Sequence, residues 1–131
     1  MSAAPGPPYT GDALLSAVTD ALVALHQKYY HRKPVTAKSQ LLGGDLLACV
    51  MGGVYTDVEK TMIELQRHAQ VQETRSSFRE AMQHKFIEEV EHLSGRDVRA
   101  FISNSHVGPD LEIELFTLSP ETARGAAAEA T

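Results

Sequence analysis

Histidine and glutamate residues recur at helical spacing in the second half of the chain, where they could hold a metal ion. His84, Glu88 and His92 lie four residues apart, and Glu89 lies three residues before His92. Di-iron bundles need two Glu-x-x-His units and two further carboxylates on facing helices, whereas this chain has one such unit. An exposed helical face, with Lys85 and Glu89 at a spacing that favours ion pairing, explains the same residues. We therefore predict no metal site.

The sequence also lacks the common motifs of nucleophilic catalysis and phosphate binding. Its single cysteine, Cys49, lies in an apolar run, where a thiol is usually buried and unreactive. Ser103 and His106 lie near a predicted loop, but no Gly-x-Ser-x-Gly elbow precedes a helix. The glycine pairs at 43–44 and 52–53 lack the spacing of a Walker or Rossmann loop. We therefore expect no catalytic residue, no cofactor and no enzyme activity.

Two arginines are the clearest candidates for binding. Arg75 and Arg79 lie one helical turn apart, and like charges at this spacing repel unless an acid or an anion lies between them. The acid can be internal, such as Glu73, Glu80 or a strand carboxylate; alternatively, an anionic ligand or a partner protein supplies the negative charge. The candidate contacts for a ligand or partner are basic and polar side chains: Arg75, Arg79, Arg96, Ser103, Asn104 and Asp110.

The charge balance argues against nucleic acid as a partner. The chain has 12 Lys and Arg against 17 Asp and Glu, a net charge of −5, whereas duplex-binding domains usually present a basic face. A basic cluster precedes and follows Pro34. It is explained by a solvated helix end, or alternatively by contact with an anion, RNA or acidic lipid; its members are Lys28, His31, Arg32, Lys33 and Lys38.

Length and composition indicate a single globular domain in a reducing compartment. The chain has 131 residues, of which 43% are apolar and 22% charged. One cysteine cannot form an internal disulfide, and the longest apolar run, 46–51, is far shorter than the ~20 residues that span a bilayer. The N-terminus has neither the basic start nor the apolar run of a secretory signal. We therefore expect a cytoplasmic protein without a membrane span.

The elements that position these residues can be read from hydrophobic spacing. Apolar residues at spacings of three and four predict a helix over 12–30, which Pro34 prevents from continuing beyond residue 33. Two runs, 38–42 and 46–51, flank the adjacent glycines Gly43 and Gly44 and predict a β-hairpin.

The next segment predicts a short helix followed by a longer one. Thr56 and Glu59 have the spacing of a capping box, and Gly95 provides a C-terminal stop. One unbroken helix over 57–94 would exceed roughly 50 Å, which is long for a domain whose radius of gyration should be roughly 14 Å. We therefore predict a break near 67–70.

The last part of the chain has the alternation typical of strands. Apolar residues alternate over 98–103 and over 111–116, and the connection 104–110 consists of turn-forming residues. The predicted order is α-β-β-α-(α)-β-β, an α+β two-layer sandwich with a four-stranded, mainly antiparallel sheet.

The predicted domain covers residues 10–119. Residues 1–9 are rich in Pro and Gly and residues 120–131 are low in complexity, so both are predicted to be disordered tails.

An ordered series of short motifs resembles the MpsC-like domain family, small bacterial and archaeal proteins long treated as a domain of unknown function. A looser resemblance covers Tyr29–Tyr30, Pro34, Thr36 and Lys38. The matching segments are Tyr55–Ile63, Ser77–Met82, Phe86–Glu91, Leu93–Val98, Phe101–Ser103 and Pro109–Asp110.

The resemblance implies a soluble bacterial component associated with a Na+-translocating, membrane-potential-generating system linked to inorganic-carbon uptake. It supplies no catalytic residue. We therefore expect a non-enzymatic, cytoplasmic accessory domain that acts by association, as a homodimer and as a peripheral subunit or regulator beside a membrane transporter subunit. The alternative is a small-ligand or anion-binding sensor that uses the candidate contacts.

Overall fold

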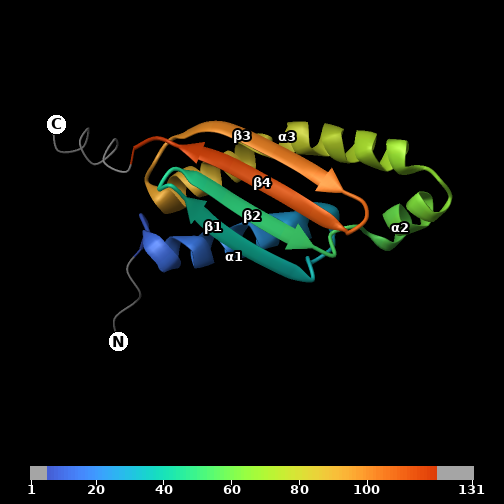
Figure 1. Ribbon diagram of the computed structural model, residues 1–131, viewed down its shortest axis with the longest axis horizontal. Helices are drawn as coiled ribbons and strands as arrows, with labels where there is room; N and C mark the ends of the chain where they lie inside the picture. The colour runs from blue at the N-terminus through green and yellow to red at the C-terminus, as the bar shows by residue number, and fades with distance from the viewer. Residues whose placement is uncertain (1–5, 121–131) are drawn as a thin grey trace.

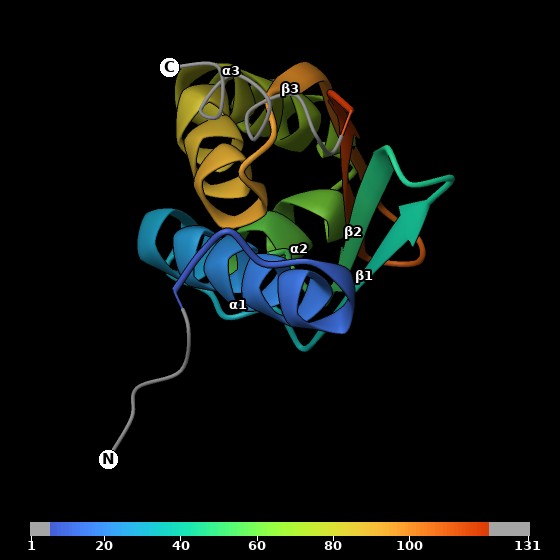
Figure 2. The same ribbon diagram turned by 90° about the vertical axis from the view of Figure 1, so that its left-hand side faces the viewer.

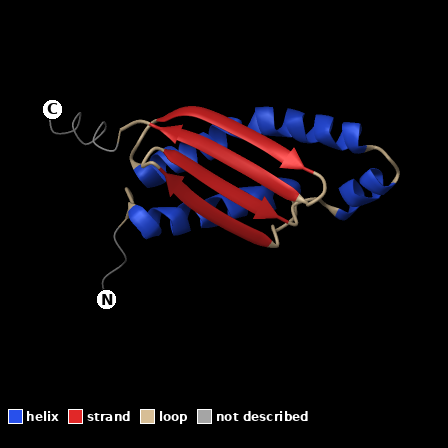
Figure 3. Ribbon diagram, viewed as in Figure 1, coloured by secondary structure: helices blue, strands red, loops and turns tan. Residues whose placement is uncertain are grey.

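The computed structural model describes residues 6–120, and within them three helices and four strands follow one another in the predicted order (Figures 1 and 3). Most of the two predicted tails, 1–5 and 121–131, lies outside the described residues. The elements are α1 (Gly11–Tyr30), β1 (Thr36–Leu42), β2 (Leu46–Gly52), α2 (Asp57–Glu64), α3 (His68–Ser94), β3 (Val98–His106) and β4 (Leu111–Leu118).

The four strands form one antiparallel sheet with the order β1-β2-β4-β3. Each hairpin therefore keeps its sequence neighbours together, and the pairing of β2 with β4 joins the two hairpins. Figure 2 shows the helices on one side of the sheet, with α1 and α3 as the two long elements of that layer. The α+β two-layer sandwich predicted from the sequence is confirmed.

The first helix packs through one face. Leu14, Val18 and Leu22 are buried and follow the apolar spacing predicted from the sequence, and His26 continues the buried row in place of the partly buried Leu25. His31 ends the helix in the left-handed conformation, with φ 56°.

The predicted capping box and helix break are both present. The Thr56 hydroxyl accepts from the Glu59 amide while a Glu59 carboxylate oxygen accepts from the Thr56 amide. The break lies over 65–67, where Gln66 has φ 63°, and α3 then continues for 27 residues, about 40 Å. Gly95 stops it in the left-handed conformation, with φ 67°.

The third strand is longer than the sequence predicted. The predicted connection 104–110 is shortened because Asn104, Ser105 and His106 continue the ladder, opposite Ile113, Glu112 and Leu111. The backbone hydrogen bonds that these residues form with β4 outweigh the preference of their side chains for turns.

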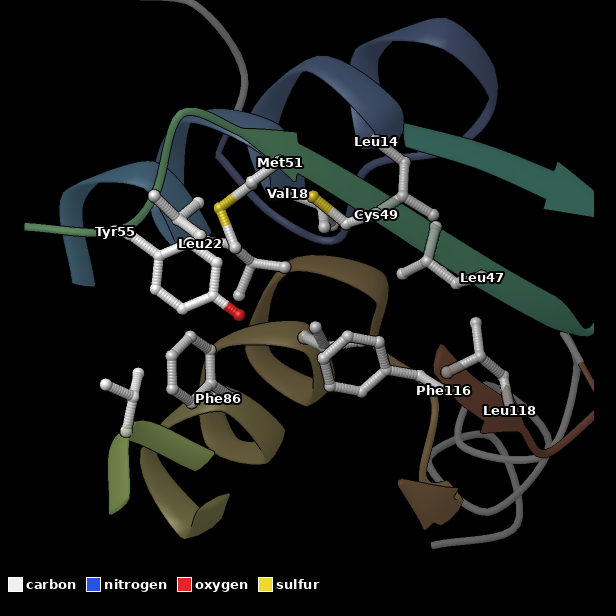
Figure 4. Close-up of a cluster of buried hydrophobic side chains, with 13 residues drawn as sticks. Leu14, Val18, Leu22, Leu47, Cys49, Met51, Tyr55, Phe86, Phe116 and Leu118 are labelled. Carbon is white, nitrogen blue, oxygen red and sulfur yellow. The ribbon is translucent and has the colours of Figure 1, made fainter. Parts of the chain in front are cut away.

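The core lies between the helices and the two central strands (Figure 4). A row of stacked rings joins α3 to the sheet, with centroids 6.2 Å apart for Phe86 and Phe101 and 4.7 Å apart for Phe101 and Phe116. The Tyr9 amide donates to the Leu93 carbonyl (2.7 Å), so this end of the predicted N-terminal tail packs against the domain.

The two faces of the sheet differ in what covers them. Along β2 and β4 every second residue is buried beneath the helices. The alternate residues point to the other side, which Figures 1 and 2 show without a covering element from the described chain. We call this surface the open sheet face; its apolar residues are Leu42, Leu46, Ala48, Val50, Ile102, Leu111, Ile113 and Leu115.

Candidate functional site

Arg75 lies at the centre of the molecule with 0% of its surface exposed. The guanidinium donates through Nε to Glu59 (2.6 Å), through Nη1 to Glu112 (2.7 Å) and through Nη2 to Glu59 and to the Val54 carbonyl (2.7 and 2.8 Å). A buried guanidinium persists only when its donors are satisfied in this way. One side chain of α3 therefore ties together α2, β4 and the loop after β2.

Glu59 has two roles in the same carboxylate. Its Oε1 accepts from the Thr56 amide, as the capping box requires, and both oxygens accept from Arg75. Burial alone would raise the pKa of Glu59, but the hydrogen bonds from Arg75 and Thr56 outweigh burial and lower it. For Arg75, burial would lower the pKa, and the hydrogen bonds to Glu59 together with the charge of Glu112 raise it instead.

Arg79 reaches the same strand carboxylate from the next turn of α3. Its Nη2 donates to Glu112 (2.8 Å) and to the Ser105 hydroxyl. Of the alternatives that the spacing of Arg75 and Arg79 left open, the structure shows a strand carboxylate, Glu112, between the two arginines, so the repulsion between them is relieved from within the chain. We call Glu59, Arg75, Arg79 and Glu112 the buried charge cluster; with all four groups ionised, its charges sum to zero.

Aromatic rings complete the surroundings of Arg75. The guanidinium carbon lies 4.5 Å from the ring centroids of both Tyr30 and Tyr55. His26 stacks on Tyr30 at 4.5 Å, and burial lowers the pKa of this histidine, with the charge of Arg75 adding to the effect. Burial raises the pKa of Tyr30 to about 12. These rings keep water away from the buried charge cluster.

Asp110 holds the loop between β2 and α2. Its carboxylate accepts from the amides of Val54 (2.8 Å) and Tyr55 (3.3 Å), and its backbone carbonyl accepts from Gly53 (3.3 Å). The same loop presents the Val54 carbonyl and the Tyr55 ring to Arg75. Asp110 therefore positions two of the contacts of Arg75.

A polar row crosses the covered face of the sheet next to the buried charge cluster. Ser39, Cys49, Glu114 and Ser103 are partners in adjacent strands. Burial raises the pKa of Glu114 to about 8, and the neighbouring Glu112 charge adds to the rise. Burial also raises the pKa of Cys49 to about 11, which makes its thiol a poor nucleophile at neutral pH.

A cavity of about 330 Å³ lies between α3 and β3, beside this row. Arg79 and Ser103 line it, and the buried Arg79 Nε atom has no hydrogen-bond partner within the described residues. Buried polar atoms are normally satisfied, so this is where a small polar ligand would find donors and acceptors. The lining residues are Ser76, Arg79, Glu80, Gln83, Phe101, Ile102 and Ser103.

Two of the six candidate contacts lie elsewhere. Arg96 donates from Nε to the Ser119 carbonyl (2.7 Å). Ser119 follows the C-terminal end of β4 and Asp110 precedes its N-terminal end, so the length of the strand, about 23 Å, separates the two sites. Asn104 is exposed, and its side-chain oxygen accepts from the Ser105 amide. The structure therefore gathers Arg75, Arg79, Ser103 and Asp110 around one strand end and sheet face, and separates Arg96 and Asn104 from them.

Glu88, Glu89 and His92 of α3 border a second cavity, also of about 330 Å³, against α1, whereas His84 does not line it. Within residues 6–120, no three His, Cys, Asp or Glu side chains are grouped so that they could hold a metal ion. The basic cluster near Pro34 is divided: Arg32 donates to the Gly53 carbonyl (3.0 Å), and Lys28 lies over the Tyr29 ring.

Sequence reasoning missed most of the groups around Arg75. The glutamates of β4 gave a usable signal, since two acids in an alternating strand must share one face. The aromatic partners gave none, because their contacts with Arg75 join distant segments. Glu112 was expected only as an unnamed strand carboxylate, and the missed residues are Glu114, His26, Tyr30 and Tyr55.

Comparison with known proteins gives one match. A family model described as a Na+-translocating membrane potential-generating system (MpsC) matches residues 10–120. No curated protein and no solved structure gives a match. None of the helices in the described part of the chain has the length and apolarity needed to cross a membrane. The match runs from before α1 to after β4 and so includes the whole buried charge cluster.

Proposed function

The chain belongs to the MpsC family, and from this premise we propose that it is a non-enzymatic, cytoplasmic accessory domain. In this proposal it acts by binding proteins, as a peripheral subunit or regulator of a Na+-translocating, membrane-potential-generating system. Inorganic-carbon uptake is the process that such a system would serve. The match over residues 10–120 supports the assignment to this kind of system.

The observation that carries the proposal is the closure of the buried charge cluster. Arg75 is fully buried and Glu112 is 2% exposed, and the hydrogen bonds of both are made to groups of the chain itself. Charged groups arranged for catalysis must reach a substrate, whereas these hold three elements in place. The cluster therefore favours a rigid scaffold that presents surfaces to partners.

Affinity purification tests the proposed association. The tagged chain is isolated from native membranes in mild detergent, and the proteins bound to it are identified by mass spectrometry. We expect an ion-translocating membrane subunit in the eluate at a fixed ratio to the chain. Turnover of a small substrate that is lost on Arg79→Ala or Asp110→Ala would contradict the proposal.

The cavity beside Arg79 favours a second candidate function, a sensor of a small polar ligand or anion. A buried polar atom without a partner among the described residues, Arg79 Nε, belongs to a residue that lines it. Thermal-shift measurements with phosphate, bicarbonate and nucleotides test this candidate. A ligand-dependent rise in Tm that Arg79→Gln removes, and that the exposed-site control Arg67→Gln keeps, would support a sensor. No rise with any of these ligands would count against it.

A further inference from the structure

The open sheet face is unusually apolar for a surface that meets water. Antiparallel sheets with one uncovered face normally carry polar residues there. Here the outward residues of β2 are Leu46, Ala48 and Val50, and those of β4 are apolar except for Thr117. Ile102 extends the apolar surface onto β3 and is 62% exposed.

Charge is nearly absent from the same face. Lys38, on the edge strand β1, is the one Lys, Arg, Asp or Glu among the outward residues at paired strand positions, and the exposed Arg99 lies at the irregularity of the other edge strand, β3. The two glutamates of β4, Glu112 and Glu114, lie on the covered face instead, where both are buried. An apolar centre with charge at the rim is the composition of a protein–protein interface.

We infer that the open sheet face is the surface through which two copies of this chain pair, sheet against sheet. This inference rests on the association role proposed above and names one of its partners. A second copy fits because the patch is self-complementary: an uncharged apolar surface meets another of the same kind about a two-fold axis. Stacked sheets pack about 10 Å apart through such side chains, as in β-sandwiches. Lys38 would stay at the rim, in water.

The size of the face also suits a dimer. Four strands about 4.8 Å apart and seven to nine residues long cover at least roughly 19 by 23 Å, or about 440 Å² in projection for each copy. Side-chain relief increases the accessible area beyond the projection. The two copies together then approach the ~1,200 Å² at the lower end of specific interfaces. Pairing would leave α1, α2 and α3 free, so the helical layer would remain available to a membrane partner.

Light scattering after size-exclusion chromatography tests the pairing over roughly a hundredfold range of concentration. Val50→Glu and Ile102→Glu place a charge on the face; Ile102 is exposed enough that its replacement should not disturb folding. The matched control is Val58→Glu, because Val58 is an exposed apolar residue on α2, away from the sheet. Far-UV circular dichroism verifies that each variant is folded.

We expect the wild type and Val58→Glu to have twice the 14.3 kDa chain mass. Ile102→Glu and Val50→Glu should raise the dimer dissociation constant by at least about tenfold, because each would bury a charge in the apolar contact. A wild type that is monomeric at every concentration overturns the inference, as does a dimer that both face variants leave intact. A monomer that still captures the membrane subunit would remove the pairing and keep the proposed function. A dimer that captures no membrane subunit would keep the pairing and contradict the proposed function.

Discussion

At Arg75, four hydrogen bonds from one guanidinium end on two carboxylates and a carbonyl in three different segments. Taking these charges out of water costs free energy, and the contacts that they make to each other offset that cost. The net contribution of such a set to stability can be small. Removing one member should lower stability strongly, because the remaining charges stay buried without a partner.

Arg75→Met should therefore lower the free energy of unfolding by about 3–5 kcal/mol. Glu59 and Glu112 would be left close together with less positive charge between them. Urea unfolding at neutral pH, followed by far-UV circular dichroism, measures the change. The control is Arg67→Met, an exposed arginine just before α3, which should change the value by less than about 0.5 kcal/mol. Equal effects of the two substitutions would show that the cluster does not hold the fold.

Glu114 makes stability depend on pH. Its pKa is about 8 in the folded protein against an ordinary value of 4.5, so between these values the folded state holds a proton that the unfolded state has released. Stability should then fall as pH rises toward 8, by about 1–2 kcal/mol between pH 6.5 and 8. Glu114→Gln should remove this slope, which urea unfolding at several pH values would reveal.

The window above pH 6.5 separates Glu114 from His26. Burial lowers the pKa of His26 below its ordinary 6.5, so this histidine makes stability rise with pH, and most of that rise lies below pH 6.5. Above pH 6.5 its contribution is small and opposite in sign to that of Glu114. The lowered pKa of Glu59 acts at still lower pH, below its ordinary 4.5. A wild type whose stability stays constant from pH 6.5 to 8 would contradict the assignment to Glu114.

At the scale of elements, α2 is short and depends on its capping box and on Arg75. Eight residues cannot form a stable helix alone. Thr56→Ala removes one cap and should cost about 1 kcal/mol. Glu59→Ala removes the reciprocal cap and the ion pair and should cost about 3 kcal/mol or more. Urea unfolding of both variants compares the two costs, and equal costs would mean that Glu59 acts only as a cap.

The spacing of residues predicted every helix and strand because each signal is local. Thr56 and Glu59, which are three residues apart in the sequence, indicated the start of α2, and Gly95 indicated the end of α3. Which face of a strand is covered is not local: in β4 apolar residues alternate with Glu112 and Glu114, and the face with the two glutamates is the covered one. The arginines of α3 that pair with Glu112 lie far away in the sequence. The order β1-β2-β4-β3 and the partners of Arg75 depend on long-range packing and could not be predicted from spacing.

At the scale of the whole molecule, the charge distribution disfavours polyanions. The net charge is −5, and the basic cluster near Pro34 is partly used within the chain, with Arg32 bound to the Gly53 carbonyl. A chain with this negative net charge should gain little from releasing counterions from nucleic acid.

Fluorescence anisotropy of a labelled DNA duplex should therefore show no saturable binding at physiological salt. The same titration at low salt serves as the control for weak, non-specific attraction. Saturable binding at physiological salt that Lys33→Glu weakens would contradict this expectation and would show that the basic cluster contacts nucleic acid.

The contact of Arg75 with Tyr30 and Tyr55 gives the protein a spectroscopic reporter of its own centre. The chain has no tryptophan and only four tyrosines, so tyrosine dominates its near-ultraviolet signals, and two of the four lie against this one guanidinium. Near-ultraviolet circular dichroism should thus follow the opening of the middle of the molecule without any added label. Comparison with the far-ultraviolet signal would then show whether the centre and the secondary structure are lost in one step.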